Sequence, residues 1–501
     1  MKYLLVLSLL FAIAIVPITS TVNAEQTIPS WIKTTADFWV KGQVSDKEFI
    51  NALQYLVKEK ILTIPQTETI LSGKTISHDP IKEGKILFTN VNIFDGKSDS
   101  LQPNMNVLVV GNKIQTISQN KIEPQSDTMT IDGKGRTMTP GFIDLHAHMM
   151  LQMSVDEAFT TDEFYHAYVA TQTADTYLMH GFTTIRDMSG NSFSLKKSID
   201  KGIIDGPRIY PSGPMISQTS GHSDHRFDAQ DSALVGGEPS VMMKYGHVAI
   251  ADGEAEVLKA VRENLRRGAT QIKIAVGGGV GSYADPLDVT EYTPTEIRAA
   301  VQAANDWGTY VAAHVYNSDG IRRAVDNGVI SIEHGNLVDE STLLYMKEHD
   351  VWLSPQVVVF QSDLKGFTAD QIKKQEQANA GIDNMFTMAK KIGYDKIVFG
   401  SDFLSDPEQL KNHLNDEFTA RAKWFTPAEV MQQATSKAGE LVAMSGPRNP
   451  YGKVGVIEEG AMADLLLING NPLEDINILA NPDDNFVIIM KDGKIYKDIF
   501  D

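Results

Sequence analysis

The sequence predicts an α/β fold: a (β/α)8 TIM barrel with a small β-sandwich built from both chain ends and a short N-terminal helical module. Residues 140–445 alternate strand-like runs with helix-like stretches, a pattern typical of a parallel sheet with crossover helices. The segments on either side, 82–139 and 446–501, are instead rich in short β-type runs. A chain of 501 residues can hold one large barrel with such additions.

Eight candidate strands support the barrel. They are Phe142–His146, Thr183–Asp187, Arg208–Gly213, Gln271–Val276, Tyr310–His314, Ser331–His334, Trp352–Val357 and Lys396–Gly400. Two helix starts in the same region have the spacing of a capping box, in which a threonine and a glutamate three residues later each satisfy a backbone N–H of the other. They are Thr293 with Glu296 and Thr426 with Glu429, each with proline at the first helical position.

The two flanking segments share a strand-rich texture. The first contains the runs Ile86–Phe88, Asn92–Phe94, Val107–Val110 and Lys113–Ile114, and the second contains Ala463–Ile468 and the hairpin Val487–Ile495. Turn residues such as Asp95 and Gly96 separate the runs. Because both segments flank one long middle, we expect them to join in a single small sandwich.

Residues 1–24 have the features of an export signal. Lys2 is followed by the apolar run Leu4–Ile18 and by small residues at Val22–Ala24. A membrane-spanning helix needs about 20 apolar residues, so this run is short for one. We therefore predict a cleaved signal peptide, an exported protein (periplasmic, cell-surface or secreted) and no stable membrane insertion, with an uncleaved anchor as the alternative.

Residues 25–75 are predicted to form the helical module. Ser45 and Glu48 have capping-box spacing, and apolar residues then recur on one helical face. The pattern favours a packing appendage over a binding role.

Charge and cysteine content exclude several classes of function. The formal net charge of −19 repels phosphate backbones, which disfavours nucleic acid as a partner. The chain has no cysteine, so disulfides, thiolate metal sites and cysteine nucleophiles are excluded. A metal site would have to be built from His, Asp, Glu or a modified Lys.

Metal-capable side chains stand where the predicted barrel strands end. The first strand ends in His146 and continues to His148, and residues two apart on a strand point the same way. The fifth strand ends in His314, the sixth in His334, and Asp402 follows the eighth. Because barrel enzymes place their reactive groups at this end, these side chains are candidates for one metal centre.

A lysine inside the fourth strand is also unusual. Lys273 stands between Ile272 and Ile274, so it would point into the barrel, where a bare ammonium is costly to bury. Carboxylation by CO₂ would turn it into an anionic carbamate able to bridge two metals. A lysine that extends to the strand end is the alternative.

The ordered set His-x-His, Lys, His, His, Asp resembles the binuclear amidohydrolase superfamily. The entry motif Thr139–Asp144, the closing motif Gly460–Leu465 and the Lys491–Lys494 hairpin extend the resemblance over nearly the whole chain after the helical module. The glycine run after Lys273, the Gly-His loop after strand three and the Ala-His-x-Tyr at strand five are similar to the Xaa-Pro/Xaa-Arg dipeptidase and imidazolonepropionase-like branch. Ser401 departs from the usual threonine but keeps the hydroxyl.

The resemblance implies two divalent metal ions, with Zn²⁺ best suited and Mn²⁺ or Co²⁺ also compatible. It implies that His146, His148 and Asp402 hold one ion, that His314 and His334 hold the other, and that N6-carboxylysine at Lys273 bridges both. It makes Asp402 the catalytic group, first as general base and then as general acid. His222, His225, Tyr316, Tyr283 and His413 are the candidate substrate-binding residues.

The expected function is an exported hydrolase that cleaves peptide-like or N-acyl amino acid amide bonds with a metal-bridging hydroxide. A cyclic amide hydrolase and a non-catalytic exported binding protein are the alternatives, and Lys273 argues against a deaminase. A small-molecule amide or dipeptide is the expected partner, and the resemblance leaves a homo-oligomer open.

Overall fold

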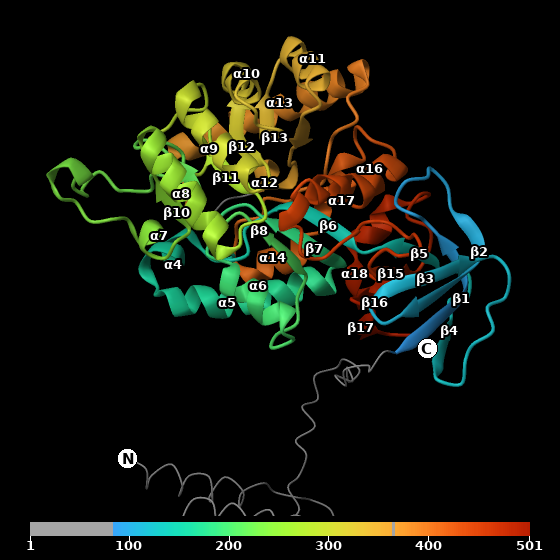
Figure 1. The fold of residues 1–501 in the computed structure, drawn as a ribbon. Coiled ribbons are helices and arrows are strands. Elements are labelled where there is room, and N and C mark those ends of the chain that lie inside the picture. Colours follow the sequence, from blue (N-terminus) through green and yellow to red (C-terminus); the bar gives the residue numbers. More distant parts are fainter. Residues whose placement is uncertain (1–83, 363–365, 501) are drawn as a thin grey trace, which may run out of the picture. The chain divides into compact units, whose positions relative to one another are not determined.

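The computed structural model describes residues 84–362 and 366–500, drawn in colour in Figure 1. The predicted signal peptide (1–24) and helical module (25–75) lie outside these residues and stay predictions. In the part of the chain that the structure describes, no helix has the length and apolar character needed to cross a membrane.

Both ends of the described part of the chain meet in one sheet. Among the described residues this sheet has eight strands, in the order β17-β16-β15-β5-β1-β2-β3, with β4 parallel to β1. The strands are β1 (Lys85–Ile93), β2 (Gln102–Val110), β3 (Lys113–Ser118), β4 (Thr128–Asp132), β5 (Thr137–Pro140), β15 (Leu465–Ile468), β16 (Phe486–Lys491) and β17 (Lys494–Asp498). The antiparallel pairing of β5 with β15 joins the two ends and places Thr139 opposite Leu466. The runs predicted separately at 86–88 and 92–94 form the single strand β1.

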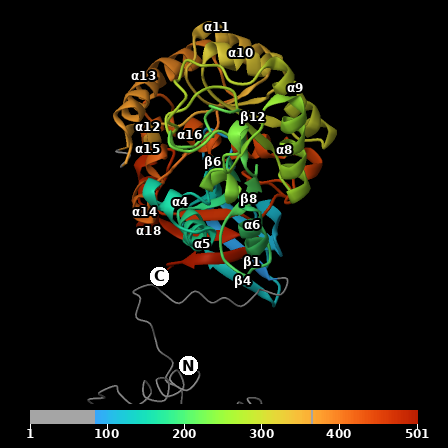
Figure 2. The same ribbon diagram turned by 90° about the vertical axis from the view of Figure 1, so that its left-hand side faces the viewer.

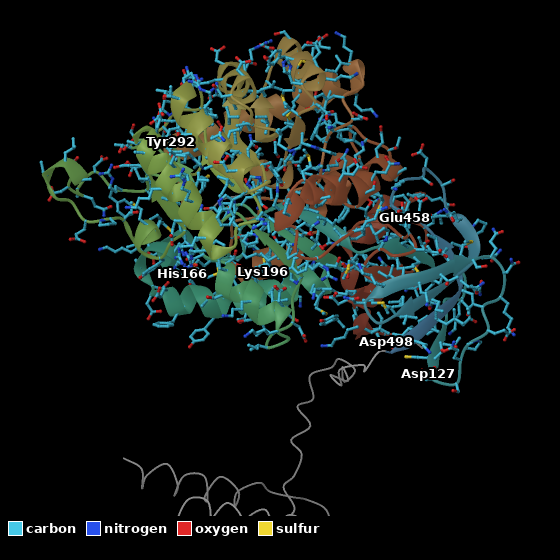
Figure 3. All side chains as sticks on the ribbon, viewed as in Figure 1. Asp127, His166, Lys196, Tyr292, Glu458 and Asp498 are labelled. Carbon is cyan, nitrogen blue, oxygen red and sulfur yellow. The ribbon has the colours of Figure 1, made fainter. Side chains whose placement is uncertain are left out.

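This sheet has its own apolar core and its own surface ion pairs. Phe88, Val107 and Met490 are buried together in a cluster separate from the main core. Glu458 pairs with both Lys97 and Lys453, and Figure 3 shows it beside the sheet. The sheet thus has an apolar core of its own, while Leu466 and Phe486 of β15 and β16 also join it to the main core.

The middle of the chain forms two parallel sheets. One consists of β6 (Phe142–Ala147), β7 (Phe182–Asp187) and β8 (Arg208–Pro211), and the other has the order β10-β9-β11-β12-β13-β14. The strands of the second are β9 (Met215–Ser217), β10 (Val248–Ile250), β11 (Ile272–Ala275), β12 (Val311–Asn317), β13 (Ser331–Leu337) and β14 (Trp352–Ser354). The alternation of strands and helices predicted for this region is therefore present, with β9 and β10 as strands that the sequence analysis did not predict.

Helices follow most of these strands and lie outside them. In Figure 2, α8 to α11 and α13 form an arc around β12. The helices are α4 (Val155–Thr160), α5 (Glu163–Met179), α6 (Phe193–Asp200), α7 (Val241–Lys244), α8 (Gly253–Arg267), α9 (Pro294–Asp306), α10 (Ser318–Asp326), α11 (Glu340–Glu348), α12 (Val358–Gln361), α13 (Ala369–Ile392), α14 (Pro407–His413), α15 (Asp416–Arg421), α16 (Pro427–Gln433), α17 (Ser436–Ala443) and α18 (Pro482–Asn485). Both predicted capping boxes are confirmed at the starts of α9 and α16.

The predicted eighth strand, Lys396–Gly400, is not a regular strand. Only Ile397 forms a bridge, with Leu353 of β14. The segment nevertheless bonds to both neighbours, because Leu353 N donates to Lys396 O at 2.9 Å and Leu145 N of β6 donates to Phe399 O at 3.0 Å. The hydrogen-bond pattern of the segment is irregular because the N–H of Phe399 donates to Gln433 O instead of to a neighbouring strand. The segment therefore lies between β14 and β6 without forming a strand ladder with either.

Candidate functional site

One cavity of about 210 Å³ collects most of the predicted site residues. Its lining includes all the predicted metal ligands, namely His146, His148, Lys273, His314, His334 and Asp402, and the predicted substrate residues His222, His225, Tyr283 and Tyr316. These residues come from β6, β11, β12, β13, the segment after residue 396 and loops that follow strands. Side chains more than 250 positions apart in the sequence thus meet in one place.

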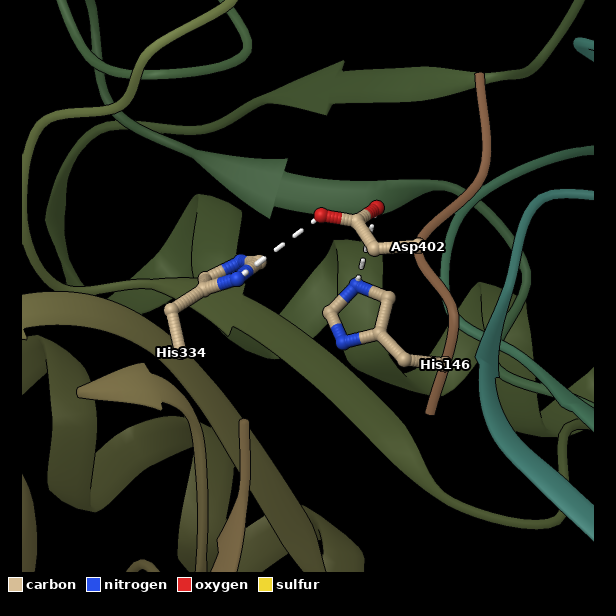
Figure 4. Close-up of side chains that lie close together, drawn as sticks. All are labelled: His146, His334 and Asp402. Atoms are coloured by element: carbon tan, nitrogen blue, oxygen red, sulfur yellow. Dashed lines mark ion pairs between the residues drawn. The ribbon is translucent and has the colours of Figure 1, made fainter. Parts of the chain in front are cut away.

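Asp402 is at the centre of the histidine group. Its Oδ1 lies 3.0 Å from His148 Nε2 and 3.6 Å from His146 Nε2. Its Oδ2 lies 3.7 Å from His334 Nδ1, and Figure 4 shows the carboxylate facing the rings of both His146 and His334. Ligand atoms of His146, His334 and Asp402 all lie within 4.8 Å of one another, close enough for one metal ion to contact all three.

Each of three histidines uses one ring nitrogen on an acceptor of the protein. His146 Nδ1 lies 2.9 Å from Glu333 Oε2, His334 Nδ1 lies 2.7 Å from Gln356 Oε1, and His314 Nε2 lies 3.2 Å from Gly278 O. Because all three partners are acceptors, each of these nitrogens carries the proton. The opposite nitrogen of each ring is then left with a lone pair, the arrangement that metal-bound histidines have in proteins.

The site also favours the charge states that metal binding needs. Burial, followed by the charge of Lys273, lowers the pKa of His146 to about 4, and burial holds the pKa of His314 and His334 well below the usual value. Burial alone would raise the pKa of Asp402, but the neighbouring histidines outweigh it and hold this pKa below its usual range. Neutral imidazoles around an ionised carboxylate are donors that suit a divalent cation.

Lys273 is fully buried at this cavity. Within the described residues its Nζ makes no hydrogen bond and no ion pair, although a buried ammonium ordinarily needs a partner. Burial lowers the pKa of Lys273 to about 8, against the opposing charges of Glu333 and Asp402. The lowered pKa favours the neutral amine, which is the form that reacts with CO₂.

The backbone before Asp402 is held against β6. Asp144 Oδ1 accepts from His146 N at 2.9 Å and from Ser401 N at 3.1 Å, and Asp144 Oδ2 accepts from the Ser401 hydroxyl at 2.5 Å. A Cβ on Gly400 would lie 2.8 Å from the Cβ of His146, so only glycine fits there. The Ser401 hydroxyl and Gly400 together let Asp402 approach the histidines of β6.

A buried ion pair between Arg186 and Glu333 lies on the Nδ1 side of His146, and it was not predicted from the sequence. Glu333 lies one residue before His334, accepts from Arg186 Nη2 at 2.8 and 2.9 Å and contacts His146 Nδ1. Both side chains are fully buried. The sequence did contain a signal for this ion pair, because Arg186 and Glu333 are charged residues inside two predicted barrel strands.

Replacing Glu333 by glutamine is expected to weaken metal binding or activity about 10- to 100-fold, the usual effect of losing the carboxylate behind a metal-bound histidine. The buried Arg186 would also lose its counter-charge, which costs roughly 3–5 kcal/mol of stability. Metal titration and thermal unfolding measure the two effects. The exposed Glu348→Gln is the matched control, and unchanged metal affinity in Glu333→Gln would contradict the supporting role.

The loop after residue 217 holds His222 against a predicted metal ligand. The His222 ring stacks on His314 with centroids 3.8 Å apart. His222 Nδ1 lies 3.0 Å from Ser282 Oγ and 3.5 Å from Asp285 Oδ2, and the His222 N–H donates to Glu291 Oε1. The ring is thus oriented by its surroundings, with Nε2 as the nitrogen that has no such partner among the described residues.

Three other predicted substrate residues have different surroundings at the cavity. Tyr316 stacks on His334 with centroids 5.0 Å apart. His225 packs against Phe159, with centroids 6.2 Å apart, and Tyr283 packs against Phe227, with centroids 5.7 Å apart. Their rings therefore lie against a predicted metal ligand or against other aromatic side chains.

The structure does not bring His413 into this cavity. His413 is at the end of α14, bonds to Asp416 Oδ2 at 2.8 Å and lines a separate hollow with Gln409. Its side chain is 46% exposed, which is typical of a surface residue. The position of His413 after the eighth predicted strand indicated a cavity residue. The prediction was wrong because His413 ends α14, which lies outside the cavity.

Comparisons with known proteins show the family to which the chain is similar. Residues 137–496 match the profile of the Amidohydrolase family. The chain is 31% identical to ochratoxinase of Aspergillus niger over 381 residues, which cover 72% of this chain and 75% of that protein. A crystal structure of a prolidase complexed with N-methylphosphonate-L-proline is 33% identical, with a TM-score of 0.76 over 83% of this chain and 100% of that one. A Xaa-Pro dipeptidase with methionine in its active site is 31% identical, with a TM-score of 0.72 and the same coverage.

Proposed function

Because the chain belongs to the amidohydrolase family, and so is a hydrolase acting on carbon–nitrogen bonds, we propose that it cleaves peptide-like or N-acyl amino acid amides with two divalent metal ions. The observation that carries this proposal is the orientation of the histidines. His146, His314 and His334 each commit one nitrogen to a protein acceptor and keep a lone pair on the other.

The residues present fit two metal ions. His146, His148 and Asp402 would hold one ion, and His314 and His334 the other, with Zn²⁺ the best match for nitrogen and oxygen donors without sulfur. Lys273, as N6-carboxylysine, would bridge both: its neutral amine forms a bond to the carbon of CO₂ and releases a proton. When bound, the ions polarise the substrate carbonyl and lower the pKa of water to about 7.

Asp402 is the group we assign to proton transfer. Its Oδ1 and Oδ2 both face histidine nitrogens, so the carboxylate is fixed in orientation and remains ionised. It takes the proton of the attacking water as general base and returns it to the departing amine as general acid. His222, Tyr316 and Tyr283, which line the cavity, would orient the substrate.

The names of the relatives support an amide substrate. Ochratoxinase and prolidase-like enzymes are among the proteins to which the chain is most clearly similar. A cyclic amide hydrolase is the alternative activity, and a non-catalytic binding protein is the alternative without chemistry. Asp402 and Lys273 at the cavity argue for an active site.

The proposal has three further parts. Residues 1–24 direct export. Residues 396–402 complete a closed barrel between β14 and β6, as their backbone bonds to both strands suggest. A homo-oligomer of the chain is the third part.

The test is metal content per chain, measured together with hydrolysis of a panel of dipeptides and N-acyl amino acids. We expect about two metal ions per chain and turnover of part of the panel. Two ions without turnover on the panel, but with opening of a cyclic amide, would favour the alternative activity. No metal after reconstitution, with Lys273 unmodified in the mass spectrum, would overturn the proposal.

A further inference from the structure

A small apolar cluster borders the cavity but is separate from the barrel core. Met153, Ala158, Met242 and Val248 are buried together, with Leu151 and Phe159 packed against them. They come from the segment before α4, from α4 itself, from α7 and from β10. All six of these side chains also line the cavity. We call Met153, Ala158, Met242 and Val248, with Leu151 and Phe159, the apolar wall.

The apolar wall faces a cavity whose charged lining lies only at the metal-binding end. Among the described residues, Lys273 and Asp402 are the lining side chains of Lys, Arg, Asp or Glu type. The Asp402 carboxylate is already engaged by His148 and His146. Other lining residues, such as Val280 and Phe360, extend the apolar character, and the Phe360 ring reaches His334, with centroids 6.1 Å apart.

This distribution discriminates between two classes of amide. A dipeptide carries an α-ammonium on the carbon next to the scissile carbonyl, so the charge enters the cavity with the reacting group. Burying it without a carboxylate partner is unfavourable. An N-acyl group of the same shape without the ammonium instead gains from contact with apolar surface. Two methionines in the wall suit this role because their side chains adapt to irregular aliphatic or aromatic groups.

Resting on the proposed function, we infer that the substrate is an amide with a bulky, apolar and uncharged acyl group, and that the apolar wall binds this group. N-acyl amino acids with aliphatic or aromatic acyl chains are then preferred over free dipeptides. Met242 and Val248 are specificity-determining residues for the acyl chain, which lies against them while the carbonyl lies at the metal end.

The experiment compares three substrates with one leaving amino acid: its N-hexanoyl, its 2-aminohexanoyl and its N-acetyl derivative. The first two differ only by the α-ammonium, and the first and third only by chain length. For the metal-loaded protein we expect kcat/KM of the hexanoyl compound to exceed both others at least about tenfold. A 2-aminohexanoyl compound cleaved as well or better overturns the inference while the proposed function stands. A protein with two metal ions per chain that cleaves none of them, nor any of the wider panel, counts against the proposed function itself.

Variants of the wall make the test specific. Met242→Glu places a carboxylate in the wall and is expected to lower the hexanoyl to 2-aminohexanoyl ratio at least about tenfold. Val248→Phe narrows the cavity at the apolar wall and is expected to reduce the ratio of kcat/KM for the hexanoyl compound to that for the acetyl compound. It is the second variant if Met242→Glu does not fold. Met129→Glu, at a methionine of β4 that is 50% exposed, is the matched control and should leave both ratios unchanged. Ratios unaltered in folded, metal-loaded Met242→Glu and Val248→Phe would overturn the assignment of the wall.

Discussion

Replacing Asp402 by asparagine is expected to lower kcat of the metal-loaded protein by about 10²- to 10⁴-fold, the range that a positioned acid–base group contributes. The amide has nearly the shape of the carboxylate but cannot accept a proton from water and return it to an amine. Its oxygen can still face His148 and His146, so the fold is expected to remain intact. The measurement is kcat at equal metal content, with circular dichroism as the check on folding.

Asp395→Asn is the control for this variant, since Asp395 is exposed and lies only seven positions before Asp402. It should retain wild-type kcat. An Asp402→Asn protein that is fully loaded with metal and turns over near the wild-type rate would contradict the assignment of proton transfer to this side chain.

Lys273→Ala is expected to lose metal and to lower activity more than about 100-fold. This loss is larger than the roughly 10- to 100-fold typical when a group that only hydrogen-bonds to a metal ligand is removed. The methyl side chain removes the only group from β11 that could bridge two ions, and it leaves an empty volume in a fully buried position. A short carboxylic acid, supplied with bicarbonate, can enter that volume and restore an anionic bridge. Partial recovery of activity is therefore expected, measured with the metal content of the same samples.

Lys259→Ala on α8 is the matched control for the lysine variant, because Lys259 is exposed. Its metal content and activity should be those of the wild type. A Lys273→Ala protein that binds two ions at full affinity would show that no carbamate is needed. A wild-type mass without the addition of one CO₂, in protein that holds both ions, would lead to the same conclusion.

Much of the candidate site could be predicted from local sequence pattern. The period of two along a strand places His146 and His148 on one side, and a charged Lys273 between two isoleucines indicates a special environment. Helix starts could also be predicted from local sequence, because a capping box involves residues only three apart, as at Thr293 and Glu296. These features depend on neighbours along the chain, which the sequence displays directly.

Other features were missed or misjudged because they depend on contacts between distant segments. The segment Lys396–Gly400 has the composition of a strand, but its backbone bonds are divided among Leu353, Leu145 and Gln433, so it is not a regular one. Its irregular path ends at Asp402, whose φ of 51° lies in the left-handed region. No local pattern indicates which of several possible backbone partners a segment will choose.

The sequence by itself determined the donor types: histidine, lysine and aspartate at strand ends, with no cysteine to compete. Only the tertiary structure decided how these donors are oriented and what surrounds them. Glu333 and Arg186 meet behind His146 because β13 and β7 bring them together, and α14 keeps His413 away from the cavity. The apolar wall likewise exists only where segments that are distant in sequence pack side by side. The reason is physical: strand periodicity sets the direction of a side chain, whereas its partners follow from long-range packing.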